Sequence, residues 1–197
     1  MRIFIALGIP ASIQEELAEL QNVLRSVNTR ITWTFPANIH LTLRFLGEIT
    51  DRSLDEVIES SRRTAERVRP FSLALEGVGV FPNQRQPRVL WAGLKGEIAS
   101  VTELARLLNE VLAARGFVPE SKPLRPHLTL GRLKSHERVE ELLSLGRDHQ
   151  FQQQQFAVQE VLVIQSELGR TGSRYTVRAH LPLSGLTSMH GEPPHHR

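Results

Sequence analysis

The chain of 197 residues contains no cysteine. Disulfide bonds, a thiolate nucleophile and a zinc site with cysteine ligands are therefore excluded. No apolar run approaches the roughly 20 residues that cross a bilayer. The apolar stretch at residues 1–7 is too short for a secretory segment and is soon followed by Pro10. We therefore expect a cytoplasmic protein without membrane contact, and a monomer as its default state.

Sequence motifs for metal binding are also missing, since neither a His-x-His nor a His-Glu-x-x-His spacing occurs. We accordingly expect no metal and no cofactor. Hydrophobic residues make up 40% of the chain and charged residues 23%, as in an ordinary soluble globule. The net charge is only +3, but the basic residues are overwhelmingly arginine, whose planar fork suits phosphate oxygens.

The most informative feature is the tetrapeptide His-Leu-Thr-Leu, which occurs at residues 40–43 and again at 127–130. Each copy lies in an apolar, β-favouring run, from Ile39 to Leu46 and from Leu124 to Leu133. Side chains two positions apart in a strand point to the same face. We therefore expect the histidine and threonine of each copy to project together, with the two leucines in the core behind them.

Sequence patterns that recur at a fixed offset indicate an internal duplication within one domain, residues 1–183, with halves at roughly 1–80 and 88–183. His127 lies 87 residues after His40, and the pattern Glu-Leu-Ala-x-Leu at 16–20 recurs at 103–107 with the same offset. Both halves are predicted to run strand, helix, strand, helix, strand. Such halves can pack about a pseudo-twofold axis, with the two His-x-Thr strands on opposite sides of a central groove. Residues 184–197 lack an apolar period, and we expect a disordered tail there.

Helix starts are predicted from capping boxes, in which a serine is followed three residues later by a glutamate. Three such pairs precede apolar helical stripes, at Ser12, Ser53 and Ser100. A turn-rich connection at residues 81–87 separates the two halves.

Two histidines that face one another suit general acid–base catalysis, because imidazole titrates near neutral pH. One can take a proton from an attacking water while the other gives a proton to a departing oxygen. Hydroxyls of Thr42 and Thr129, beside the histidines, are placed to donate hydrogen bonds to phosphoryl oxygens. A lone histidine on a strand is more often structural. The second copy at a repeat-preserving offset favours function, because packing alone would be served by valine or isoleucine.

These residues resemble the 2H phosphoesterase superfamily, and more closely its RNA 2′,3′-cyclic phosphodiesterase branch, also called the LigT-like 2′-5′ RNA ligases. The resemblance runs from Arg2 to about Leu183. It rests chiefly on the doubled motif and is supported, in the family's order, by the residues at 2–6, 38–47, 81–82, 88–91 and 126–132 and by a hairpin with Ser166, Gly172 and Tyr175.

The resemblance implies a bilobal α+β fold, with two antiparallel sheets flanking the groove and helices outside. It also implies opening of an RNA-terminal 2′,3′-cyclic phosphate to a 2′-phosphate, without metal or ATP, and possible 2′-5′ ligation in reverse. By similarity, His40 would donate the proton to the leaving 3′-oxygen, and His127 would activate water. Thr42 and Thr129 would hold phosphoryl oxygens.

The family places groove residues five positions after each histidine, which are Phe45 and Arg132 in this chain. Phe45 would stack on the terminal base, and Arg132 would bind phosphate. Strict strand alternation puts both on the face opposite the histidines, so the transfer requires a bulge or a strand end. Alternation instead favours Arg44 for phosphate contact. Tyr175, the only tyrosine, is a candidate for the border of the groove or for packing.

Two other functions stay open. The substrate could be a small cyclic nucleotide, such as an ADP-ribose cyclic phosphate, or a 2′-5′ oligonucleotide. The chain could also be a non-catalytic binder of RNA 3′ ends, although a pure binder would need only the arginines. The sequence by itself does not determine which histidine is the acid.

Overall fold

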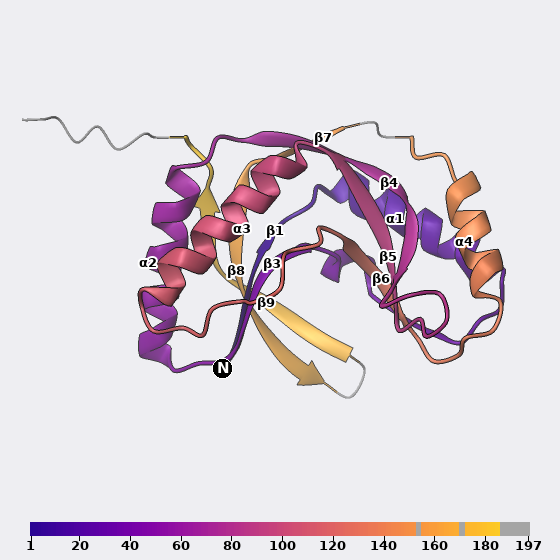
Figure 1. Cartoon of the computed structure of the whole chain (residues 1–197), viewed down its shortest axis with the longest axis horizontal. Coiled ribbons are helices and arrows are strands. Elements are labelled where there is room, and N and C mark those ends of the chain that lie inside the picture. Colours follow the sequence, from indigo (N-terminus) through magenta and orange to yellow (C-terminus); the bar gives the residue numbers. More distant parts are fainter. Residues whose placement is uncertain (153–154, 170–171, 186–197) are drawn as a thin grey trace, which may run out of the picture.

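The structure is a computed structural model that describes residues 1–152, 155–169 and 172–185, shown in Figure 1. Within these ranges the chain forms two antiparallel sheets and four α-helices, which is the α+β architecture expected from the sequence. None of these helices is long and apolar enough to cross a membrane.

The first sheet has the strand order β3-β1-β8-β9, and every neighbouring pair is antiparallel. Its strands are β1 (Arg2–Leu7), β3 (Leu41–Glu48), β8 (Glu160–Gly169) and β9 (Gly172–Pro182). The second sheet has the order β2-β6-β5-β4-β7, again antiparallel. Its strands are β2 (Ile31–Trp33), β6 (Leu128–Leu133), β5 (Val89–Gly96), β4 (Phe71–Phe81) and β7 (Phe156–Val158).

The two sheets are related as the duplicated sequence predicts, but each half lends a strand to the other. The order β3-β1-β8 in the first sheet corresponds to β6-β5-β4 in the second. Strand β4, which closes the first half, therefore pairs with β5, and β8 from the second half pairs with β1. Each sheet is thus built from both halves of the sequence.

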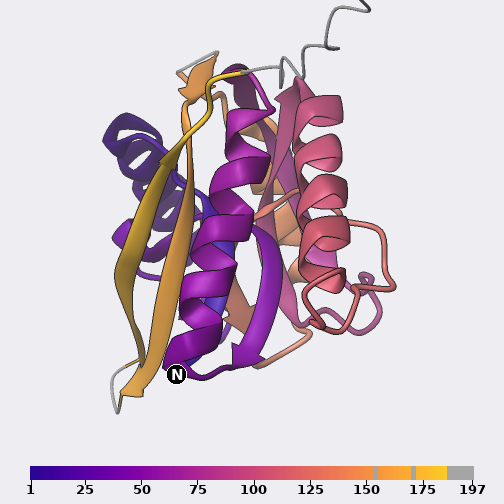
Figure 2. The same cartoon turned by 90° about the vertical axis from the view of Figure 1, so that its left-hand side faces the viewer.

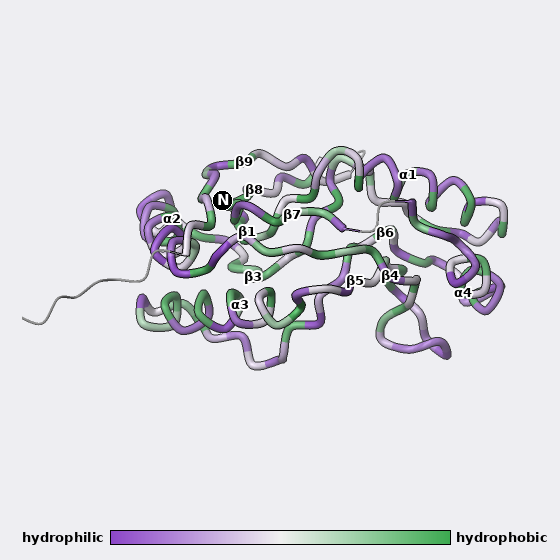
Figure 3. Tube along the Cα trace, turned by 90° about the horizontal axis from the view of Figure 1, so that it is seen from above, coloured by the Kyte–Doolittle hydropathy of each residue, from purple (hydrophilic) through white to green (hydrophobic). Residues whose placement is uncertain are grey.

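The helices form two pairs at the two ends of the molecule, as Figures 1 and 3 show, and Figure 2 looks onto one of these ends. The helices are α1 (Ala11–Arg25), α2 (Asp51–Glu66), α3 (Ile98–Ala113) and α4 (Val139–Asp148), with a short 3-10 helix η1 (Pro36–Asn38) before β3. Helices α2 and α3 lie side by side, with α2 against β8 and β9 and α3 against β3. Helix α1 lies beside α4, which packs on β4. The Gln21 amide of α1 donates a hydrogen bond to the Leu130 carbonyl in β6, at 2.9 Å.

Each His-x-Thr strand is therefore backed by the first helix of the opposite half. The leucines of both tetrapeptides are buried against these helices, as predicted from strand alternation, and the four are Leu41, Leu43, Leu128 and Leu130. Burying a leucine side chain stabilises the fold by about 1.5–3 kcal/mol. This burial fixes the orientation of the histidine and threonine on the other face.

All three predicted serine caps are wrong. Helix α1 begins after Pro10 and α3 after Glu97, and neither N-cap side chain accepts a hydrogen bond from the first backbone N–H groups of its helix. Helix α2 is capped by Thr50, whose hydroxyl accepts a hydrogen bond from the backbone N–H of Ser53 at 3.2 Å. Serine is a cap only where the chain turns into the helix at that residue, and the chain turns elsewhere in all three cases.

The first two residues of the predicted tail are hydrogen-bonded to the rest of the chain. The Ser184 hydroxyl donates to the Glu66 carbonyl at 3.2 Å, and the Gly185 N–H donates to the Val68 carbonyl at 3.1 Å. These two residues are therefore tied to the end of α2. The rest of the predicted tail, residues 186–197, lies outside the described residues.

Candidate active site

The two histidines of the repeated motif lie directly before strands β3 and β6. The sequence predicted that the histidines lie inside these strands, but each strand begins one residue after its histidine. Each imidazole is held in the same way: the Nδ1 atom is 2.7 Å from the carbonyl oxygen two residues earlier, that of Asn38 for His40 and that of Arg125 for His127. A carbonyl oxygen can only accept a hydrogen bond, so Nδ1 carries the proton in both rings. The Nε2 atom of each ring is left for chemistry.

Aromatic side chains fix the plane of the His40 ring. Phe4 of β1 stacks on it, with ring centroids 4.7 Å apart and an interplanar angle of 27°. Tyr175 of β9 meets the same ring edge-on at 5.4 Å. Phe4 and Tyr175 also touch each other, and they belong to a small apolar cluster separate from the main core. The candidate residue Tyr175 is therefore brought directly to His40.

His127 has a corresponding support in the second sheet. The ring of Phe81, at the end of β4, meets His127 edge-on with centroids 4.9 Å apart. Phe81 in turn packs against Trp91 of β5 at 5.1 Å. Sequence reasoning missed Phe4, Phe81 and Trp91 as parts of the site. These contacts cross between strands, and only the strand register brings them together.

Burial lowers the pKa of both imidazoles below the ordinary value of 6.5, because removal from water disfavours the charged ring. The hydrogen bonds to the Asn38 and Arg125 carbonyls oppose this effect. For His40 there is a further lowering of the pKa by the positive charge of protonated His127. The two rings thus lie within electrostatic reach of one another.

A β-bulge follows each threonine and changes which later side chains face the histidines. Ala6 pairs with Thr42 while Ile5 pairs with Arg44, so Leu43 is the extra residue in β3. In β6, Leu130 is extra in the same way, because Trp91 pairs with Thr129 and Leu90 with Gly131. The equivalent bulges confirm that the duplication extends to the detail of the strand.

The bulges turn Phe45 and Arg132 to the same face as the threonines. The family's roles could pass to these two residues only if such a bulge were present, because strict alternation puts them on the opposite face. Phe45 is 67% exposed, and its ring lies 5.8 Å from that of Phe4, which stacks on His40. Arg132 is exposed and pairs in register with Val89 on one side and Thr32 on the other. Both residues are therefore available to a ligand beside the histidines.

The same bulge overturns the expectation for Arg44, which turns away from the histidines. Its side chain is buried, donates a hydrogen bond to the Val118 carbonyl and lies 3.9 Å from the Glu120 carboxylate. Burial lowers the pKa of Arg44, and the charge of Glu120 opposes this effect. Arg44 therefore ties β3 to the loop after α3 and does not reach a phosphate beside Thr42.

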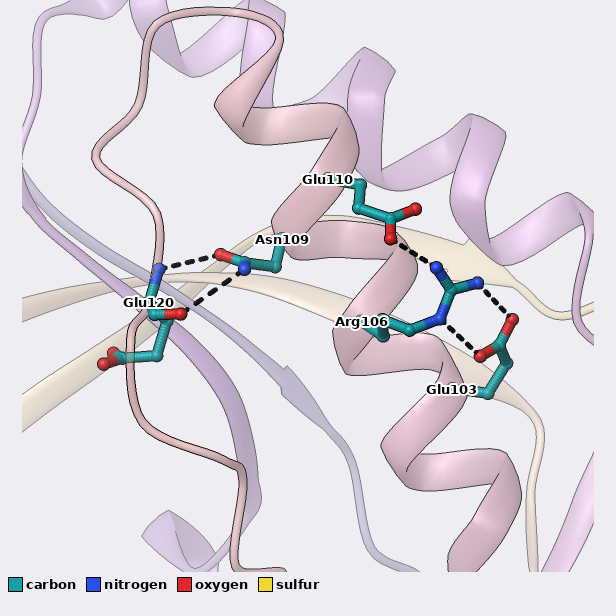
Figure 4. Close-up of polar contacts among 5 residues, drawn as sticks. All are labelled: Glu103, Arg106, Asn109, Glu110 and Glu120. Atoms are coloured by element: carbon teal, nitrogen blue, oxygen red, sulfur yellow. Dashed lines mark hydrogen bonds and ion pairs between the residues drawn. The ribbon is translucent and has the colours of Figure 1, made fainter.

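That loop leads to His127 and has a second anchor, which is on α3. Asn109 accepts a hydrogen bond from the Glu120 N–H at 2.8 Å and donates one to the Glu120 carbonyl at 3.5 Å, as Figure 4 shows. On the same helix, Arg106 pairs with Glu103 and Glu110. The approach to the second histidine is thus held by side chains from both α3 and β3.

Within the described residues, no group of three His, Asp or Glu side chains lies close enough together to hold a metal ion. The hydrogen-bond partners of the two imidazoles are the backbone carbonyls of Asn38 and Arg125. The chemistry available from the chain itself is proton transfer and hydrogen bonding.

Known proteins with similar sequences identify the family of this chain. A family model described as "LigT like Phosphoesterase" matches residues 7–91 and 94–175 of the chain. The chain belongs to this family. It is therefore a phosphoesterase of the phosphodiester hydrolase type, as the resemblance of its motifs predicted.

Curated relatives of this LigT-like chain carry one name. The "RNA 2′,3′-cyclic phosphodiesterase" of Aquifex aeolicus is 35% identical over 190 residues, covering 94% of this chain and 98% of the relative. The protein of the same name from Thermotoga maritima is 32% identical over 178 residues, covering 90% and 92% respectively.

Solved structures agree with the fold of the LigT-like chain. The protein TT0787 of Thermus thermophilus superposes with a TM-score of 0.77 at 29% identity, covering 94% of this chain and 99% of that one. Escherichia coli LigT in complex with 3′-AMP gives a TM-score of 0.71 at 25% identity, covering 93% and 98%.

Proposed function

We propose that the protein hydrolyses the 2′,3′-cyclic phosphate at an RNA 3′ end to a 2′-phosphomonoester, without a metal ion, by acid–base catalysis with His40 and His127. One observation carries the proposal. Two partly buried imidazoles, each with Nδ1 held by a backbone carbonyl and Nε2 left over, lie within electrostatic reach of each other. The name shared by the curated relatives supports the choice of substrate.

The reaction needs one proton taken and one proton given. Neutral His127 removes a proton from water at Nε2 as the water oxygen bonds to phosphorus. The bond from phosphorus to the 3′-oxygen breaks, and protonated His40 gives its Nε2 proton to that oxygen. The phosphate stays on the 2′-oxygen, and the two histidines end with their protonation states exchanged. The choice of His40 as acid follows the family.

The other site residues have binding roles in this proposal. Thr42 and Thr129 follow their histidines on one face, where their hydroxyls can donate to the non-bridging phosphoryl oxygens. Phe45 offers an exposed ring for stacking on the terminal base, and Arg132 offers its fork to phosphate. Tyr175 acts by packing on His40 and bordering the site.

With a 5′-hydroxyl in place of water, the same residues can join two RNA ends. The 5′-oxygen bonds to phosphorus, the bond from phosphorus to the 3′-oxygen breaks, and the 3′-oxygen takes a proton, which leaves a 2′-5′ linkage. A small cyclic nucleotide is the second candidate substrate, and the 3′-AMP complex of Escherichia coli LigT favours it, since that ligand is a mononucleotide. A non-catalytic binder of RNA ends is the third candidate. It gives no reason for the matched anchoring of both Nδ1 atoms.

The test is turnover of a nucleoside 2′,3′-cyclic phosphate and of an RNA with the same end, both in EDTA, by wild type, His40→Ala and His127→Ala. Loss of a positioned acid or base should lower kcat by about 10² to 10⁴-fold. His149→Ala, which removes a histidine beyond the end of α4, is the matched control and should keep full activity. Unchanged kcat in both site variants would eliminate the acid–base assignment.

A further inference from the structure

The face of β6 that carries the second motif continues past it with basic residues. Because of the bulge at Leu130, the side chains that follow Thr129 on this face are those of Arg132 and Lys134. Both are exposed. From the residue directly before β6 to the residue directly after it, the chain therefore presents an imidazole, a hydroxyl, a guanidinium and an ammonium in a line that leads away from the site.

A third basic residue, Arg30, lies directly before the edge strand β2 and extends this line. Thr32 pairs with Arg132, and the Lys134 N–H donates to the Arg30 carbonyl at 2.8 Å. Residues opposite one another in an antiparallel pair share a face, so the exposed Arg30 side chain stands beside that of Lys134. We call Arg132, Lys134 and Arg30 the basic row.

The surface here is hollowed, and no acidic residue lines the hollow. A concavity beside the basic row is lined by Asn28, Thr29, Arg30, Ile31, Thr32 and Lys134, none of which carries a carboxylate. Among the residues that the structure describes, no ion pair involves a member of the basic row, whereas Arg63 on α2 is paired with Glu59 and Arg106 on α3 with Glu103 and Glu110. The row is thus a local excess of positive charge with its donors available.

The positions of the row are held by the backbone. β2 is hydrogen-bonded to β6, and the Thr29 hydroxyl donates to the Glu137 carbonyl at 3.2 Å, which joins the two loops that flank the concavity. At about 3.3 Å per residue, Lys134 lies roughly 15 Å along the strand from Thr129. A phosphate held at Thr129 and another at Lys134 must therefore belong to different nucleotides.

We propose that the basic row is a separate binding site for the phosphodiester backbone of the nucleotides that precede the reacting 3′ end, so that an RNA strand binds more tightly than a mononucleotide with the same end. This inference rests on the proposed function and adds a binding site to it. Basic side chains that contact phosphates supply affinity without reading sequence. Recognition by the row is accordingly independent of RNA sequence.

The test compares one mononucleotide, cytidine 2′,3′-cyclic phosphate, with an RNA of about ten nucleotides that ends in the same group. Lys134→Gln and Arg30→Gln should each raise KM for the RNA about three- to tenfold, with kcat and mononucleotide turnover unaffected. The slope of log(kcat/KM) against log[salt] is negative for the RNA, and each lost contact should make it less steep by about 0.7. Arg63→Gln, which makes the same charge change on α2, should alter neither substrate.

The outcomes separate this inference from the function on which it rests. Turnover of neither substrate by the wild type overturns the proposed function and this inference together. Equal kcat/KM for the two substrates, or variants that leave KM and the salt slope for RNA unchanged, overturns the inference alone. A loss for RNA as large in Arg63→Gln as in Lys134→Gln would assign the effect to net charge and would also overturn it.

Discussion

At the scale of single residues, the two imidazoles are in matched but unequal surroundings. Both use Nδ1 to donate to a carbonyl two residues earlier, and burial lowers both pKa values. His40 is stacked on Phe4, whereas His127 meets Phe81 edge-on. The two protonation states are linked, because a positive charge on His127 lowers the pKa of His40.

This coupling predicts the pH dependence. Each pKa is lowered from 6.5, so the free enzyme holds one proton on the pair only in a window below that pH. kcat/KM, which reports the free enzyme, should be bell-shaped with both apparent pKa values below 6.5. The alkaline limb of kcat should lie at higher pH, because a bound phosphodiester anion stabilises the imidazolium. Steady-state kinetics across the acid and neutral range measure both profiles.

The opposite result is easily recognised. An alkaline limb of kcat/KM above pH 6.5 would show that the free imidazoles are not held in the desolvated state that their burial indicates. The matched variant is Phe4→Leu, which removes the ring stacked on His40 while keeping an apolar side chain there.

At the scale of elements, the strands and helices could be predicted because hydrophobic periodicity encodes them. The bulges at Leu43 and Leu130 could not be predicted, because alternation gives no sign of one extra residue. For that reason strict alternation put Arg44 on the wrong face. That His40 and His127 serve one site follows from the repeat and stays a prediction. The supporting aromatic rings were missed because their contacts depend on register between strands.

Helix caps give a direct test of such a local error. Thr50→Ala should destabilise the protein by about 1 kcal/mol, because the Ser53 N–H at the start of α2 loses its acceptor. Ser12→Ala, at a sequence pattern just as typical of a cap, should change stability by less than about 0.5 kcal/mol. Urea unfolding midpoints measure both. Equal losses would mean that α1 begins at Ser12 after all.

At the scale of the whole molecule, the exchange of β4 and β8 makes each sheet depend on both halves of the sequence. Buried residues of both sheets and all four helices form one continuous core. The sequence predicted two similar halves, but it could not show which strands they exchange, since pairing between halves leaves no local pattern.

The exchange predicts that the halves unfold together. Leu41, in the first sheet, is almost fully buried, and Leu41→Ala should cost about 2–5 kcal/mol. Both tryptophans, Trp33 and Trp91, lie in the second sheet. Their fluorescence should nevertheless report the full loss and should coincide with far-UV circular dichroism in denaturant unfolding. Val118→Ala, at a position 84% exposed, should leave the midpoint unchanged.

Independent halves would give a different record. Tryptophan fluorescence would keep its wild-type midpoint in Leu41→Ala while circular dichroism split into two transitions.

The backing of each His-x-Thr strand by a helix from the other half also limits how such a gene can diverge. A substitution that shifts α1 disturbs His127, and one that shifts α3 disturbs His40, so neither copy can drift alone without harm to its twin. Because each half supplies the helix behind the motif of the other half, the two duplicated segments have to change together.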